Sequence, residues 1–206
     1  MKIKTKFLSL EFCFLYLNFL MEGENMTQLL RAFGGFIPFF LLVSFIVLTV
    51  FIAIKLLRNK KSNKKFSFRE LVVDCGIIIS LIAVFFVTNF STLLPGIVVF
   101  DRQYNFVPFI DIYIMLKNSV SLDLVFRNIL LNICLFVPFG FLITFKIQNK
   151  LLKVTLLGFL LSFLMEFLQY VVPRGRIADI NDIITNSLGV IIGYLLAKLY
   201  QKISAL

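Results

Sequence analysis

Carboxylate side chains stand where the surrounding sequence is strongly apolar. Glu166 lies inside a long hydrophobic run, and Asp179 and Asp182 follow it within the polar stretch EFLQYVVPRGRIADINDIITNSLG, residues 166–189. Carboxylates can act as general acids or bases, accept hydrogen bonds from a ligand, or cap the first turn of a helix. The chain has no histidine, which excludes Ser-His-Asp, Cys-His and His-Glu-x-x-His catalysis and leaves carboxylates, amides, hydroxyls, arginine and lysine.

The elements that must position these carboxylates are membrane spans. Of the 206 residues 60% are hydrophobic and only 16% are charged, and an apolar helix of roughly 20 residues crosses a bilayer core about 30 Å thick. The apolar runs are continuous rather than alternating, which favours helices over a β-barrel. The sequence therefore predicts an all-α, polytopic membrane helical bundle with five spans: Gly34–Leu57, Leu71–Leu94, Ile129–Phe145, Leu151–Val172 and Ile183–Leu199.

The N-terminal extension is assigned no function. It begins with three lysines like a signal sequence, but Glu11 interrupts its apolar part and no small-residue cleavage site follows. It is either an interfacial segment or the result of a mis-called start, with Met21 or Met26 the true first residue. The chain divides into this extension (1–33), the first two spans with a basic loop (34–94), and a region with three spans and most of the polar residues (95–200).

Basic residues in the short loops predict the orientation. The loop Arg58–Glu70 holds six basic residues and one acidic residue, and the loop Lys146–Lys150 is also basic. Because lysine and arginine are retained on the cytoplasmic side, both loops should lie inside. The formal charge of +10 then reflects topology and attraction to anionic membrane lipids, and nucleic acid is not expected as a partner.

With this orientation, polar residues from three spans reach one level near the outer surface. Glu166 lies six residues before the outer end of its span, about 9 Å deep at 1.5 Å per residue, where an ionised group needs a partner or water. We expect Arg176 to be that partner. If the last helix extends past the membrane, Asp179, Asp182 and Asn186 form one stripe. Further polar residues at this level are Arg127, Asn128, Asn132, Ser162, Gln169 and Arg174.

Two interpretations of this polar set stay open. It can form an outward-facing site, with Glu166, Asp179 and Asp182 as the candidates for catalysis and the amides and arginines as binding groups. Alternatively, the amides only hold helices together and the aspartates only cap a helix N-terminus. No cofactor or metal site is predicted, because Cys13, Cys75 and Cys134 show no paired spacing and the carboxylates have no metal-ligand spacing.

The tetrapeptide FVPF occurs twice, at 106–109 and 136–139. Pro138 falls inside the third span, where it removes a backbone hydrogen bond and should bend the helix. The segment 104–116 around the first copy mixes aromatic and apolar residues. We expect it to be a re-entrant or interfacial loop that covers the mouth of the polar site.

Several of these motifs together resemble the VanZ-like family of bacterial membrane proteins. The resemblance rests on NFVPF (105–109), RNILLNICLFVPFGFLI (127–143) and the stretch 162–196 that contains the opening motif, with Ser187 where the family pattern leads us to expect threonine. It implies a plasma-membrane protein associated with teicoplanin resistance, and it implies no enzyme class. The residues that match the family pattern are Asn105, Pro108, Phe109, Asn128, Asn132, Pro138, Gly140, Glu166, Gln169, Arg176, Asp179, Asp182, Asn186 and Gly189.

Three classes of function follow from these observations. The first is a non-enzymatic envelope protein whose outward pocket binds a lipid head group or a glycopeptide and so lowers the access of the antibiotic. The second is an intramembrane enzyme that uses Glu166 with Asp179 or Asp182 on a lipid-linked cell-wall precursor, either with or without a divalent metal ion. A transporter is the weakest interpretation, since the polar residues lie near one surface and no inverted repeat is visible.

The predicted orientation can be tested by cysteine labelling. Single cysteines placed at Ser62 and Gly175, in a chain without Cys13, Cys75 and Cys134, should react with impermeant thiol reagents from the inside and the outside of the cell, respectively. The reverse labelling pattern would contradict the outward placement of the polar site.

Overall fold

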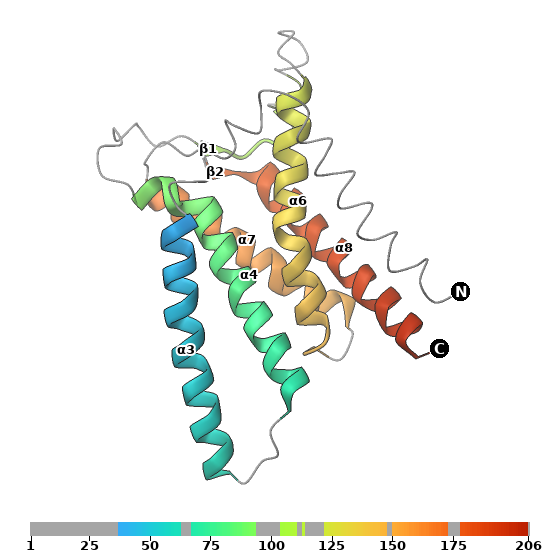
Figure 1. Ribbon diagram of the computed structural model, residues 1–206. Coiled ribbons are helices and arrows are strands. Elements are labelled where there is room, and N and C mark those ends of the chain that lie inside the picture. The colour runs from blue at the N-terminus through green and yellow to red at the C-terminus, as the bar shows by residue number, and fades with distance from the viewer. Residues whose placement is uncertain are drawn as a thin grey trace. The chain divides into compact units, whose positions relative to one another are not determined.

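The computed structural model describes residues 37–62, 67–93, 104–110, 113, 122–147, 150–172 and 178–205 (Figure 1). The N-terminal extension predicted for residues 1–33 lies outside this part of the chain. Residues from Ser44 onward form one compact unit, and the packing described below is that of this unit.

Five long helices make up most of the described chain. All five are long and apolar enough to cross a membrane, so the predicted all-α bundle with five spans is confirmed. The helices that begin at Leu122 and Ile180 start before their predicted runs, because the hydrogen bonds inside a helix continue where the sequence turns polar. The helix Leu151–Val171 ends one residue before its predicted end. Their bounds are α3 Ile37–Lys61, α4 Phe68–Leu93, α6 Leu122–Thr144, α7 Leu151–Val171 and α8 Ile180–Ser204.

Helix α8 packs closely against α6 because glycines line their contact. A Cβ atom added at Gly189 would lie 2.3 Å from the carbonyl oxygen of Ile133, and one added at Gly193 would lie 2.3 Å from that of Val137. On the facing helix, a Cβ at Gly140 would lie 2.4 Å from the carbonyl oxygen of Val190. Small residues thus let the two backbones touch, as in many membrane helix pairs.

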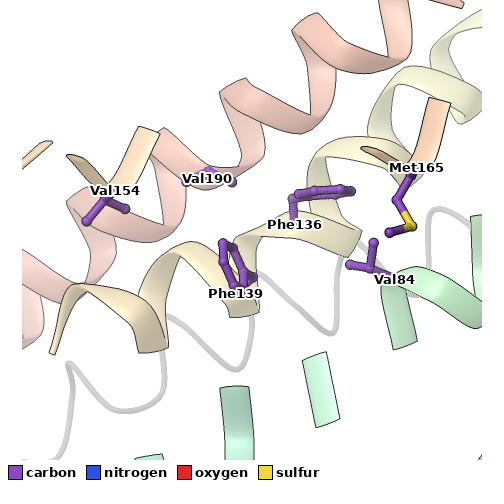
Figure 2. Packing of buried hydrophobic residues seen from close by; sticks show 6 residues of the cluster. All are labelled: Val84, Phe136, Phe139, Val154, Met165 and Val190. Carbon is purple, nitrogen blue, oxygen red and sulfur yellow. The ribbon is translucent and has the colours of Figure 1, made fainter. Parts of the chain in front are cut away.

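A small apolar core joins α4, α6, α7 and α8. Phe136 from α6 and Val190 from α8 are fully buried, together with Val84 from α4. Figure 2 shows the core cluster, whose members are Val84, Phe136, Phe139, Val154, Met165 and Val190. Pro138 lies between the two core phenylalanines inside α6, which continues as one helix to Thr144.

Outside this core most large apolar side chains are exposed. Helix α3 is the extreme case, since Ser44 is its one buried residue while Phe45 is 70% exposed. An apolar surface of this extent suits contact with lipid chains, which solvate such side chains as well as the protein interior does.

Two very short strands connect distant parts of the chain. Strand β1, Tyr104–Asn105, pairs in parallel with β2, Ala178–Asp179, so that Asn105 is opposite Asp179 (Figure 1). We did not expect this pairing from the sequence. It fixes the start of the segment expected to be a re-entrant or interfacial loop, and the described residues that follow form a turn closed by a hydrogen bond from the Ile110 N–H to the Val107 carbonyl.

The close contact of α6 and α8 leads to a stability prediction. Gly193→Ala should lower the unfolding temperature in detergent and reduce stability by about 1–3 kcal/mol, because the new methyl group overlaps the backbone of α6. Gly76→Ala is the matched control, since its methyl group would meet only the flexible end of Leu142 at 2.8 Å. Thermal unfolding of both purified variants measures the difference, and equal stability would contradict the packing argument.

Candidate functional site

The buried face of α7 carries polar side chains. Ser162, Glu166 and Gln169 are spaced by four and three residues, which places them on one side of the helix. Glu166 is only 5% exposed, and Ser162 and Gln169 are also buried. We predicted these three residues at one level of the membrane, and the structure places them on one buried face of α7.

Glu166 is held by a backbone group of the following segment. Its Oε2 atom accepts a hydrogen bond of 2.9 Å from the backbone N–H of Asp179. Asp179 lies in β2, so the short strand presents its amide to the carboxylate. Arg176, which we expected to be the counter-ion, lies outside the described residues, and its pairing with Glu166 stays a prediction.

Asp179 is the N-cap of α8. Its backbone is extended, and its Oδ1 atom accepts hydrogen bonds from the Asn181 N–H at 2.8 Å and from Asn105 Nδ2 at 3.3 Å. Of the two interpretations left open for Asp179, capping of the helix is the one that the structure shows, so Asp179 does not lie on one helical stripe with Asp182 and Asn186. An N-cap residue lies just before the helix, and its side chain accepts a hydrogen bond from a free N–H group of the first turn.

Asp182 connects the first turn of α8 to α6. Its Oδ1 atom accepts a hydrogen bond of 2.6 Å from Asn132 Nδ2. Asn128, four residues earlier on α6, is exposed, and Arg127 beside it is half-buried. Of the polar residues predicted on this span, Asn132 is the one in contact with a carboxylate of α8.

Asn186 lies deeper in the bundle. Its Nδ2 atom donates a hydrogen bond of 2.9 Å to Ser162 Oγ on α7, and the residue is 1% exposed. Its Oδ1 atom has no hydrogen-bond partner within the described part of the chain. Asn132, Asp182, Asn186 and Ser162 thus connect α6, α8 and α7 through polar side chains.

Helix α4 contributes two polar residues that the sequence analysis missed. Gln169 Nε2 donates to the carbonyl oxygen of Thr88 at 3.2 Å. Asn89 Nδ2 donates to Thr88 Oγ1 at 2.7 Å and lies 3.3 Å from the sulfur of Met165. Both Thr88 and Asn89 are buried. Two adjacent polar residues in an otherwise apolar run could have indicated that this part of α4 faces the polar site.

The segment after β1 is also anchored to α8. The side-chain oxygen of Asn181 accepts a hydrogen bond of 2.8 Å from the Phe109 N–H, and Asn181 was not among the predicted site residues. Phe109 has a φ of 62°, a left-handed conformation that is strained for an aromatic residue. Such strain persists only where neighbouring contacts hold it, and the Asn181 bond is one such contact.

The assembled site presents carboxylates held by amides. Glu166, Asp179 and Asp182 each accept a hydrogen bond from a backbone or asparagine N–H. No group of three metal-ligating side chains occurs among the described residues.

These features define a polytopic α-helical membrane protein with a polar site at one end of its bundle. A model of the VanZ/LLP1 family matches residues 71–201, more than half of the chain, and the chain belongs to this family. The predicted resemblance is confirmed, and the matched segment includes every candidate site residue. The chain matches no curated protein and no solved structure.

The contact between Asn132 and Asp182 leads to a prediction about coupling. A double-mutant cycle with Asn132→Ala and Asp182→Ala should give an interaction energy of about 1 kcal/mol, because the two substitutions remove the same hydrogen bond. Free energies of unfolding in mixed micelles provide the measurement. The parallel cycle with exposed Asn128→Ala should be additive, and equal coupling in both cycles would contradict the assigned contact.

Proposed function

We propose that this protein acts in the bacterial plasma membrane as an envelope protein whose outward-facing polar site binds a lipid-linked cell-wall precursor or the glycopeptide that recognises it. Binding there would lower the access of teicoplanin to its target. The observation that carries this proposal is the convergence of separate segments on Asp179, whose N–H bonds Glu166 and whose side chain bonds Asn105.

The composition of the site supports recognition of a polar ligand. Asparagine and glutamine amides both donate and accept hydrogen bonds, as sugar and peptide groups do. Half-buried Arg127 and exposed Asn128 lie at the same end of α6 as the polar site, where an arginine can pair with a phosphate group. The proposed binding residues are Asn105, Arg127, Asn128, Asn132, Gln169, Arg176 and Asn186.

Binding is favoured over catalysis because amide groups hold the three carboxylates. A general acid or base has to reach the proton that it transfers, whereas Glu166 is 5% exposed and accepts a backbone hydrogen bond. We therefore place Glu166 as a group that shapes the site, and half-buried Asp179 and Asp182 as groups that bind the ligand. An intramembrane enzyme that uses these carboxylates is the alternative, and it predicts that the purified chain converts a lipid-linked precursor as well as binding it.

The proposal predicts a resistance phenotype that depends on the carboxylates. Overexpression of the chain in a susceptible Gram-positive host should raise the inhibitory concentration of teicoplanin. Glu166→Gln and Asp182→Asn keep the size of each side chain and remove its charge, so each should return the inhibitory concentration to that of the empty vector. Glu70→Gln is the matched control, because this carboxylate is exposed near the other end of the bundle.

Each variant must accumulate in the membrane and stay monodisperse in detergent for this comparison. Unchanged teicoplanin sensitivity with the wild-type chain present in the membrane would refute the proposed role. Full resistance in both carboxylate variants would refute the site. If purified Glu166→Gln protein aggregates while Glu70→Gln protein does not, Glu166 serves the fold and not the ligand.

A further inference from the structure

A second polar region lies at the opposite end of the bundle, between the end of α3 and the start of α4. A cavity of about 660 Å³ opens there, and we call it the basic groove. The proposed function does not use it. Its lining residues are Phe51, Ile54, Lys55, Arg58, Asn59, Lys61, Ser62 and Asp74.

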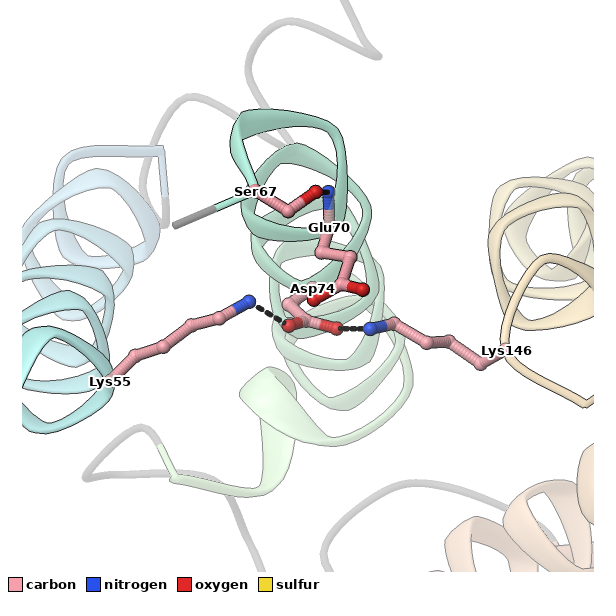
Figure 3. Close-up of polar contacts among 5 residues, drawn as sticks. All are labelled: Lys55, Ser67, Glu70, Asp74 and Lys146. Atoms are coloured by element: carbon pink, nitrogen blue, oxygen red, sulfur yellow. Dashed lines mark hydrogen bonds and ion pairs between the residues drawn. The ribbon is translucent and has the colours of Figure 1, made fainter. Parts of the chain in front are cut away.

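Positive charge dominates the basic groove. Lys55, Arg58 and Lys61 line it, and Asp74 is the one acidic residue among its described lining residues. Asp74 is already shared, because it forms an ion pair with Lys55 on one side and with Lys146 on the other (Figure 3). Arg58 and Lys61 are exposed and have no ion-pair partner within the described residues. The groove therefore retains unpaired cations that an anion can neutralise.

The ion pairs at Asp74 also hold one wall of the groove in place. Lys55 comes from α3 and Asp74 from α4, while Lys146 follows the end of α6 (Figure 3). The Lys55 side chain is only 17% exposed, and its ammonium lies 6.0 Å from the centre of the Phe51 ring. Because these contacts hold its side chain in place, Lys55 forms part of the groove wall, unlike a lysine in a solvated loop.

An apolar wall continues the groove along α3. Phe51, Lys55, Arg58 and Ser62 are spaced by four, three and four residues, which places them along one side of the helix. Ile54, one turn before Arg58, is 50% exposed. An anion bound by Arg58 and Lys61 would thus have apolar side chains directly beside it, on the side that leads into the apolar run.

We propose that the basic groove binds the phosphate head group of an anionic phospholipid, with Arg58 and Lys61 on the phosphate and an acyl chain along Phe51 and Ile54. A phosphate next to a hydrocarbon chain is the chemistry that matches cations next to exposed apolar side chains. The basic loops also predict that this end faces the cytoplasm, where anionic head groups attract clustered lysine and arginine. A soluble phosphate compound would gain nothing from the apolar wall.

The experiment measures lipid binding to the purified full-length chain by native mass spectrometry from detergent micelles. Phosphatidylglycerol should bind more tightly than phosphatidylcholine at equal concentration. The double variant Arg58→Gln, Lys61→Gln should bind phosphatidylglycerol roughly twenty-five-fold more weakly, at about fivefold for each basic residue removed near a membrane surface. The binding should also weaken as the salt concentration rises.

The matched control is Lys198→Gln, Lys202→Gln, which removes the same charge from α8. This control should bind phosphatidylglycerol like the wild type. Equal binding of phosphatidylglycerol by the groove variant and the wild type would overturn the proposal, and so would equal binding of the two lipids. Displacement of the lipid by millimolar inorganic phosphate would also overturn it, because the groove would then be a site for soluble anions. If the double variant aggregates, the same comparison is made with Arg58→Gln alone, for which about fivefold weaker binding is expected.

Discussion

The absence of water in a bilayer core is the constraint on which the rest of this structure depends. A polar group placed there must find its partner inside the protein, since lipid chains offer no hydrogen bonds. The polar face of α7 follows this rule, because Glu166, Gln169 and Ser162 each bond a group from another element. The polar contacts therefore determine which helices are neighbours and which faces meet.

Close helix packing makes these polar contacts possible. Asparagine and aspartate have short side chains, so Asn132 can reach Asp182 only if α6 and α8 come close together. Gly189 and Gly193 permit that approach, because any larger side chain would overlap the backbone of α6. The glycines of α8 thus set the short distance between α6 and α8, and the polar residues in the first turns of α8 need that short distance to form their hydrogen bonds.

The two ends of the bundle use charge differently. At one end, Glu166, Asp179 and Asp182 accept hydrogen bonds from amides. At the other end, Asp74 is paired with two lysines, and further cations line the basic groove. Amide-held carboxylates suit a directional contact with a polar ligand, whereas unpaired cations suit an anionic surface. The proposed ligands differ accordingly.

The sequence by itself determined the number of spans, their helical nature and the family, because long apolar runs and ordered motifs are local features. It also indicated that Glu166 needs a partner, since its depth follows from the position of the residue in its run. It could not identify the backbone of Asp179 as a hydrogen-bond donor to Glu166, nor decide whether Asp179 caps the last helix or lies on it. It likewise missed Thr88, Asn89 and Asn181. These contacts join residues far apart in the chain, and only the tertiary packing of the helices decides which distant polar groups come within hydrogen-bonding distance.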